Sequence, residues 1–590
     1  MAVAAFVAAS AIVPNLVLIS IGYMVGEVPA AAREGLASPA GHTLLVALAL
    51  AGIASAVAVL LGPIQTFLST SLKWKLIYSM QARLMSAVSQ PVGIGHLEQP
   101  QVLDRLALAR GQLINYYPAD AVMTLAMVAS NRIGGLLACV AVGTYRWWLG
   151  AGMLAMWLAI RRPQRSVITE QARTFNTNAE VMRRAFYFEQ LASGPEAAKE
   201  ARIFGLGGWL IDRFRAQWTI GMTASWKALR RLDSRVLGLS LIVLAGYAAA
   251  TTFLGVQAYQ HQIALGTLCA LLPLLIATNT VGDISWDDVG LAWMLEALPR
   301  VDELEAQLGT HHEADPASQQ EAPVGDRPMQ EIRFTGVVFR YPEAERPVFD
   351  GLELSIPAGV STAIVGVNGA GKTTLVKLLA RLHDPTAGVI TVDGVPLGDL
   401  RAREWQRRVA VVFQDFVRYP LSACDNVGFG AVEHILDTAG MSDAARTAGA
   451  LDLIESLPHG WDTVLSSRYK SGVDLSGGEW QRVALGRALF AVAHGARLLV
   501  LDEPTAWLDV RGEADFFDRF LDITRGLTTI VISHRFSTVR RADRICVLDA
   551  GRLIEVGDHS SLLATGGRYA QMFHMQASRF AEDSPSEDTR

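Results

Sequence analysis

The sequence has little charge and few cysteines. Only 18% of its residues are Asp, Glu, Lys or Arg, whereas about 25% is usual for a soluble globular chain. The net charge of −5 excludes the global basic field that bulk nucleic-acid binding would need. The cysteines lie far apart, without CxxC metal spacing or a disulfide framework, and we interpret them as buried apolar residues. They are Cys139, Cys269, Cys424 and Cys546.

The missing charge is concentrated in the N-terminal half. Residues 1–26, 36–72 and 236–282 contain no Asp, Glu, Lys or Arg, and residues 121–145 contain one, Arg132. A helix needs about 20 apolar residues to cross a membrane, so these runs predict an all-α transmembrane domain. We expect six spans, at about 2–26, 43–67, 119–143, 147–162, 236–257 and 263–282.

Two of these spans have alternative interpretations. A cleaved signal peptide would have a shorter apolar core than the first span and basic residues before it, so a retained span is favoured. The span at 147–162 is short. It requires either flanking arginines that snorkel or shelter from neighbouring helices.

The basic residues between the spans predict their orientation. The connections 73–118 and 161–235 contain most of the lysines and arginines of this half. The positive-inside rule therefore places both connections in the cytoplasm. With six spans, both termini are cytoplasmic and the chain is a multi-pass protein of the cell (inner) membrane. Arg132 within the third span is a functional candidate by default, and a structural pairing with a polar neighbour such as Asn131 is the alternative.

The composition changes after residue 308, which predicts further domains. Residues 1–308 form the transmembrane domain, and the polar stretch 309–329, rich in Ala, Pro and Gln, reads as a linker. Residues 330–577 are expected to form a second domain of the α/β class, and 578–590 a disordered tail.

A glycine-rich loop in the second domain predicts a phosphate site. The strand pattern STAIV at 361–365 runs into G-x-x-x-x-G-K-T and then into a helical pattern, which is the strand–loop–helix context of a P-loop NTPase. Backbone N–H groups and the helix N-terminus would surround phosphate oxygens. Lys372 would reach the β- and γ-phosphates, and the Thr373 hydroxyl would ligate Mg²⁺. The loop residues are Gly366, Asn368, Gly369, Ala370, Gly371, Lys372, Thr373 and Thr374.

Two carboxylates follow a second buried strand pattern, RLLVL at 497–501. Asp502 at the strand end suits Mg²⁺, directly or through water. Glu503 is placed to polarise a water in line with the γ-phosphate. Two adjacent acids on a loop are usually only solvated, but four apolar strand residues before them make that interpretation weak.

Between these two motifs stands LSGGEWQR at 475–482. It resembles the ABC-transporter signature, with Glu479 in the place of a glutamine. Other elements of that family also occur in order. They are Tyr341 in VVFRYP, which resembles the aromatic residue that stacks on adenine; Gln414 in VVFQD, the Q-loop glutamine that touches Mg²⁺; Asp509 in TAWLD, the D-loop aspartate, although Trp507 replaces a small residue; and His534 in VISHR, the switch histidine.

The whole chain resembles an exporter-type ABC half-transporter. The resemblance implies that ATP and Mg²⁺ bind at Thr373, Gln414 and Asp502, and that Glu503 and His534 act in hydrolysis. It implies a dimer, in which Ser476, Gly477 and Gly478 complete the phosphate cage of the partner. The partner is a second copy or a similar half-transporter. The segments 97–106 and 195–206 resemble coupling helices, and ordinary amphipathic helices are the alternative.

The expected function is ATP-driven export of a hydrophobic or amphipathic small molecule, lipid or peptide across the bilayer by alternating access. One alternative is an exporter-fold importer of a siderophore-like substrate. Another is a non-transport ABC ATPase acting on DNA or ribosomes, against which the six spans and the lack of a basic field argue. No nucleic-acid partner is expected. Residues such as Trp157, Tyr247 and Asp283 are candidate substrate contacts beside Arg132.

Overall fold

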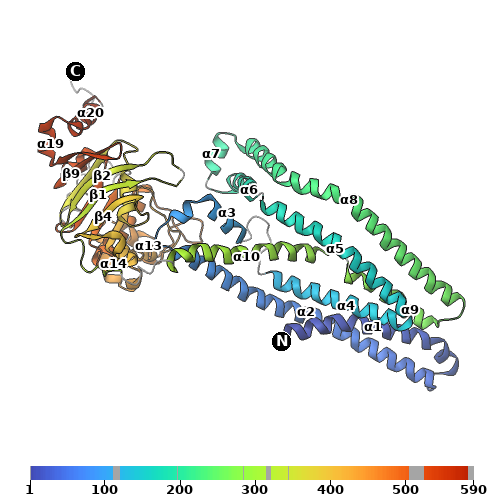
Figure 1. Ribbon diagram of the computed structural model, residues 1–590. Helices are drawn as coiled ribbons and strands as arrows, with labels where there is room; N and C mark the ends of the chain where they lie inside the picture. Colours follow the sequence, from blue (N-terminus) through green and yellow to red (C-terminus); the bar gives the residue numbers. More distant parts are fainter. Residues whose placement is uncertain are drawn as a thin grey trace, which may run out of the picture. The chain divides into compact units, whose positions relative to one another are not determined.

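The computed structural model describes residues 2–109, 120–177, 179–195, 197–282, 285–313, 321–342, 344–503 and 524–582. The chain divides into two compact units. The helical unit comprises Met1–Pro91 and His96–His312, and the α/β unit comprises Val92–Gly95 and Glu313–Arg590. In Figure 1 the first is built from helices alone, and the second from sheets covered by helices.

The helical unit consists of long helices joined by short connections. Its elements are α1 (Ala2–Glu34), α2 (Pro39–Ser89), η1 (Gly95–Glu98), α3 (Pro100–Ala109), α4 (Ala121–Tyr145), α5 (Trp147–Thr177), α6 (Ala179–Ser193), α7 (Ala198–Ile203), α8 (Gly207–Tyr259), α9 (Leu265–Ala277), η3 (Thr278–Val281) and α10 (Trp286–Glu313). Ser38 caps α2, because its side chain accepts a hydrogen bond from the Gly41 N–H. Figure 1 shows α1, α2, α4, α5, α8 and α9 running along one another.

Four of the described helices are long and apolar enough to cross a membrane: α1, α2, α4 and the Gly238–Tyr259 part of α8. The expected span at 147–162 begins α5, which continues past Pro163 to Thr177. The expected span at 263–282 is the shorter apolar pair α9 and η3. Both pack within the helical unit, α5 against α4 and α8, and α9 against α1, so neighbouring helices shelter them.

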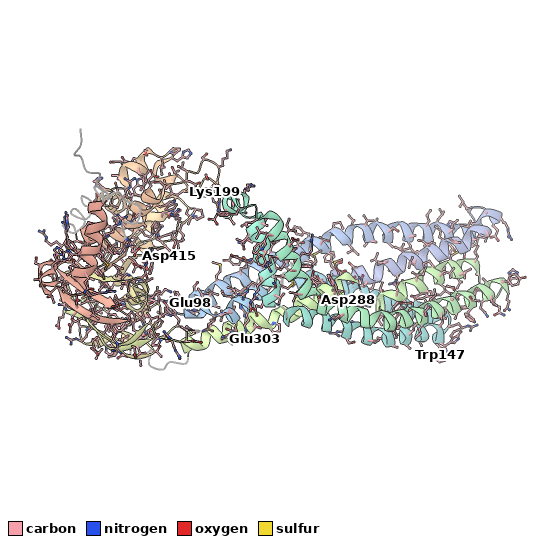
Figure 2. All side chains as sticks on the ribbon, turned by 90° about the horizontal axis from the view of Figure 1, so that it is seen from above. Glu98, Trp147, Lys199, Asp288, Glu303 and Asp415 are labelled. Atoms are coloured by element: carbon pink, nitrogen blue, oxygen red, sulfur yellow. The ribbon has the colours of Figure 1, made fainter. Side chains whose placement is uncertain are left out.

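The last apolar segment is interrupted between α9 and α10, and Arg132 stabilises the interruption. Arg132 on α4 donates from Nη1 to the Thr280 carbonyl oxygen at 2.8 Å and pairs with Asp288 at 2.5 Å. Asp288 also accepts from the backbone and hydroxyl of Ser285, and Figure 2 shows it among the long helices. Tyr247 on α8 hydrogen-bonds the Thr278 hydroxyl at 3.1 Å. Arg132 therefore holds a broken helix together, with partners distant in sequence.

The α/β unit contains two sheets. The four-stranded sheet has the order β2-β1-β4-β5 and is antiparallel, and the six-stranded sheet has the order β10-β9-β3-β8-β7-β6. The strands are β1 (Glu331–Phe339), β2 (Phe349–Pro357), β3 (Ser361–Gly366), β4 (Ala387–Val392), β5 (Val395–Pro396), β6 (Val409–Val412), β7 (Leu498–Asp502), β8 (Thr528–Ile532), β9 (Arg544–Asp549) and β10 (Arg552–Gly557). All residues of β3, β7 and β8 are buried, as expected for parallel strands covered on both faces.

Parallel pairing positions the candidate site. Strand β3 pairs in parallel with β8, and β8 with β7. The segments that leave these strands, at 366–374, 502–503 and 533–534, therefore meet at one edge of the sheet. Ligands of open α/β sheets bind at this carboxyl edge.

Helices cover the sheets of the α/β unit. They are α11 (Lys372–Leu379), α12 (Ala402–Arg408), α13 (Ala423–Gly428), α14 (Thr438–Thr447), α15 (Leu451–Ser456), α16 (Gly477–Ala493), α18 (Phe536–Val539), α19 (His559–Thr565) and α20 (Arg568–Glu582), with the 3₁₀ turns η5 (Leu397–Asp399), η6 (Val432–His434) and η7 (Gly460–Asp462). Trp405 of α12 is fully buried, and its indole N–H donates to the Leu379 carbonyl oxygen at 2.7 Å.

The ends of the α/β unit differ in detail from the sequence-based boundaries. Part of the expected linker is packed: Val324 is 1% exposed, and the Ala322 N–H donates to the Asp399 carbonyl oxygen. Helix α20 includes the first residues of the expected tail. Residues Val92–Gly95 also belong to this unit. There the Ile94 N–H donates to the Leu382 carbonyl oxygen, and Gln406 donates to that of Val92.

The η3 turn packs closely against α4 at Gly135 and leaves no space for a side chain there. A Cβ there would lie 2.5 Å from Thr280 Oγ1 and 2.7 Å from Val281 N. Gly135→Ala should destabilise the protein by about 1–3 kcal/mol, the usual cost of overpacking, although alanine favours helix. Gly152→Ala on α5 is the control, because no atom lies within 4 Å of its Cβ position. Thermal denaturation in detergent compares the two, and equal melting temperatures would contradict the packing.

Candidate nucleotide site

The loop between β3 and α11 takes its shape from glycines. Gly369 and Gly371 have φ of 83° and 96°, a left-handed region that other residues rarely adopt. A Cβ on Gly371 would also lie 2.7 Å from the Phe349 ring. Gly371 directly precedes α11, so the loop ends on a helix N-terminus. Its amide groups and the helix dipole suit an anion.

Lys372 is held inside this loop. Its side chain is 8% exposed, and its Nζ donates to the carbonyl oxygens of Gly366 at 2.9 Å and Val367 at 3.2 Å. Burial lowers the pKa of Lys372, and the carboxylates of Glu503 and Asp502 oppose that shift. The ammonium group thus lies between the loop and the two acids.

The two acids have different surroundings. Asp502 is 2% exposed and accepts from Thr373 Oγ1 at 3.0 Å. Burial raises the pKa of Asp502, an effect that the Thr373 hydrogen bond reduces. Glu503 has a φ of 51°, a strained conformation typical of functional sites. Its carboxylate accepts from Gln414 Nε2 at 2.8 Å and lies 3.2 Å from His534 Nδ1.

These groups surround one cavity of about 670 Å³. It brings together most of the residues proposed from the sequence: Asn368, Gly369, Gly371, Lys372, Thr373, Thr374, Gln414, Asp502, Glu503 and His534. Val348, before β2, also lines it; no motif in the sequence marks this residue. Gly366 and Ala370 instead shape the loop. A Cβ on Gly366 would lie 2.4 Å from the Leu548 carbonyl oxygen, and Ala370 is buried.

Tyr341 lies beside the loop. Its hydroxyl hydrogen-bonds the Thr374 hydroxyl at 3.3 Å, and the Phe339 ring packs edge-on against it at 5.0 Å. Lys377 Nζ lies 5.2 Å from the centre of the ring. The Lys377 contact was not predicted, although Lys377 is one helical turn beyond Thr373. Tyr341 is therefore fixed next to the phosphate-loop helix, where an aromatic face can reach a base.

The LSGGE segment forms the start of α16, outside this cavity. Ser476 caps the helix, and its backbone N–H donates to Glu479 Oε2 at 2.7 Å. Hydrogen bonds from Ser476 lower the pKa of Glu479, so this carboxylate stays ionised in a reciprocal cap. Gly477 and Gly478 form the first turn of α16. Ser476, Gly477 and Gly478 are not among the residues that line the cavity, and Asp509 lies outside the described residues.

The oxygen donors of the cavity fit Mg²⁺. A hydroxyl from Thr373, a carboxylate from Asp502 and an amide from Gln414 line it together. Mg²⁺ prefers such ligands and usually binds through one or two carboxylates, with phosphate oxygens and water. No group of three or more His, Cys, Asp or Glu side chains able to hold a metal occurs among the described residues. The three oxygen donors would hold Mg²⁺ together with phosphate oxygens.

Comparisons with known proteins agree with this geometry. Residues 349–506 match the family model described as ABC transporter. An ATP-dependent lipid A-core flippase of Alkalilimnicola ehrlichii is 43% identical over 256 residues, which are 43% of this chain and 42% of that protein. The corresponding flippase of Alcanivorax borkumensis is 34% identical over 402 residues, 66% of this chain and 64% of the relative. The alignments thus cover less than two thirds of these relatives.

A solved structure of a bacterial Atm1-family ABC exporter with ATP bound has the same fold. The TM-score is 0.68 at 24% identity, over 96% of this chain and 98% of that chain. The family match and the fold define the class: a helical membrane domain followed by an ABC transporter ATPase domain. This is the domain order that the resemblance to an exporter-type ABC half-transporter implies. The predicted fold class and family resemblance are confirmed.

Substitutions of Tyr341 test its place beside the nucleotide. Tyr341→Ala should weaken ATP binding by about 1–3 kcal/mol, the value of an aromatic–base stack. Tyr341→Phe keeps the ring and loses only the hydrogen bond to Thr374, so it should bind ATP almost as well as the unchanged protein. Fluorescent-nucleotide titration of the purified protein measures both. Equal affinity in the alanine variant would remove Tyr341 from the base site.

Proposed function

We propose that the protein hydrolyses ATP and uses the energy to export an amphipathic molecule or lipid across the cytoplasmic membrane. One observation carries the proposal. The cavity at the carboxyl edge of the sheet combines a phosphate loop and lysine with two acids, a glutamine and a histidine. Such a set can bind a triphosphate and position water against it.

The roles in hydrolysis follow from the contacts. The loop amides and Lys372 bind the β- and γ-phosphates. The phosphate oxygens replace the carbonyl oxygens of Gly366 and Val367 as hydrogen-bond acceptors of Lys372. Thr373, Asp502 and Gln414 would hold Mg²⁺, which would neutralise phosphate charge. Glu503 takes a proton from the attacking water. His534 and Gln414 orient the Glu503 carboxylate from both sides, and His534 also reaches the γ-phosphate.

The position of the signature supports a dimer. Ser476, Gly477 and Gly478 lie outside the cavity of their own chain, yet the start of α16 offers amide groups to an anion. In the proposed assembly these groups, with Asp509, face the nucleotide of a partner, which is a second copy or a similar half-transporter. ATP then favours the closed dimer because only that state makes contacts to both chains.

Closure of the ATPase domains drives the membrane domain. The segments 97–106 and 195–206, found in η1, α3 and α7, are the proposed coupling elements. Substrate leaves toward the outside as the membrane helices rearrange. The relatives are named as lipid A-core flippases, which supports a lipid or other amphiphile as the transported molecule.

Glu503→Gln separates binding from hydrolysis. The amide keeps the size of the side chain but cannot take the proton from water. ATP hydrolysis should therefore slow by about 10²–10⁴-fold, the usual contribution of a general base, while ATP stays bound. Steady-state ATPase assays and measurement of retained nucleotide test this. The control is Glu455→Gln, an exposed glutamate on α15 away from the cavity, and hydrolysis at an unchanged rate by Glu503→Gln would exclude Glu503 as the base.

The proposed topology is testable by labelling. In a cysteine-free variant, single cysteines replace Gln101 on α3 and Gln260 between α8 and α9, both exposed. An impermeant maleimide on intact cells should label the second position alone, because basic connections stay inside. Permeabilised cells should show both. Labelling of only the Gln101 position in intact cells would show the opposite orientation and contradict the proposed topology.

A further inference from the structure

The helical unit contains a cavity of about 790 Å³ between α1, α4 and α9. Figure 1 shows these helices side by side. Its wall depends on small residues: a Cβ on Gly266 of α9 would lie 2.5 Å from Gly26 Cα, and one on Gly22 would lie 2.3 Å from Ala270 Cβ. The remainder is mainly apolar, with Ile12, Leu16, Ile19, Leu137, Val140 and Leu274 among the lining residues. A cavity of this size and character suits one amphiphile.

One end of the cavity, at Asn15, has an unused hydrogen-bond acceptor. Asn15 on α1 is 8% exposed and lines the cavity. Its Nδ2 donates to the carbonyl oxygens of Ala11 at 3.0 Å and Gly134 at 3.1 Å. These two acceptors fix the orientation of the amide. Asn15 Oδ1 is buried and has no hydrogen-bond partner in the described part of the chain. A buried acceptor of this kind is costly unless a ligand donates to it.

The opposite end of the cavity is acidic. Glu27 is the only charged side chain among the described residues that line the cavity, and no described residue pairs with it. Glu27 directly follows the expected first span, 2–26, and a carboxylate that lines a mainly apolar cavity favours a cationic partner. The Tyr145 hydroxyl on α4 also lines the cavity and is buried without a described partner. Arg146 is exposed, and its guanidinium lies over the Tyr145 ring, outside the lining.

The Asn15 end and the Glu27 end of the cavity are separated by several helical turns. From Asn15 to Glu27 are 12 residues along α1, or about 18 Å at 1.5 Å per residue. From Gly134, which contacts Asn15, to Tyr145 on α4 the rise is about 17 Å. Glu27 and Tyr145 therefore lie at the same end, and Asn15 at the other. An elongated ligand would meet an acceptor at each end and apolar side chains between them.

We infer that this cavity binds a cationic amphiphile whose ammonium group lies at Glu27 and Tyr145 and whose far end donates a hydrogen bond to Asn15. The inference rests on the proposed function and narrows its substrate class. An anionic headgroup is disfavoured, because the described lining contains a carboxylate and no basic side chain. Arg132, the arginine within the third expected span, does not line the cavity and pairs with Asp288.

Binding to the purified full-length protein in nanodiscs tests the charge. Dodecylamine, dodecanol and dodecyl phosphate are titrated without nucleotide, with intrinsic tryptophan fluorescence as the readout. Dodecylamine should bind most tightly. Glu27→Gln should weaken dodecylamine about tenfold or more, because hydrogen bonds to charged groups are stronger than neutral ones, and leave dodecanol unchanged. Glu34→Gln, at the end of α1 and outside the lining, is the matched control.

A comparison of two amines tests hydrogen bonding to Asn15. Aminododecanol carries an ammonium group and a hydroxyl donor at opposite ends. It should bind the unchanged protein about threefold to tenfold more tightly than dodecylamine, since one added hydrogen bond contributes that much. Asn15→Leu, which removes the acceptor, should abolish this difference and leave dodecylamine binding intact.

The outcomes separate this inference from the proposed function. Tighter binding of dodecyl phosphate than of dodecylamine would overturn the cationic assignment. The same conclusion follows if dodecylamine binds the Glu27→Gln variant with the same affinity as the unchanged protein, or if dodecylamine does not bind the unchanged protein at all. ATPase activity is measured separately on the same samples. Its absence in the unchanged protein, with amine binding retained, would contradict the proposed function alone.

Discussion

The hydrogen bond from Thr373 to Asp502 joins two segments 129 residues apart, and the parallel strand pairing that allows this bond also positions the rest of the nucleotide site. The bond links the helix after β3 to the end of β7 across the intervening strand β8. In the same strand arrangement, Lys372 interacts with both carboxylates, and Glu503 contacts Gln414 and His534. The bond exists because parallel pairing brings three strand ends to one edge. A different strand order would separate Thr373 from Asp502 and would also separate Glu503 from Gln414 and His534.

Much of the nucleotide site could be predicted from the sequence, because its residues occur in short motifs at fixed spacing. The loop, Asp502, Glu503, Gln414 and His534 line one cavity as a consequence. Val348 could not be foreseen, since it belongs to no motif and enters through the antiparallel sheet. The structure also explains why Glu479 suits the signature: its carboxylate accepts the Ser476 backbone N–H in a helix cap. The roles of Ser476, Gly477, Gly478 and Asp509 remain predictions.

In the membrane half, composition predicts helices but not their partners. The absence of charge marks α1, α2, α4 and the end of α8 clearly. The absence of charge is less informative for α5 and α9. Their apolar parts are short, which is possible because neighbouring helices shelter them. The pairing of Arg132 with Asp288 and the unused acceptor of Asn15 depend on contacts between helices far apart in sequence. A local pattern contains no information on such contacts, so Arg132 could only be recognised as unusual.

Lys372 has a further consequence for the energetics of the phosphate loop. Because its ammonium group already donates to two carbonyl oxygens of its own loop, a phosphate that binds replaces these bonds instead of adding to them. The lysine therefore contributes to affinity only by the difference between a charged and a neutral acceptor.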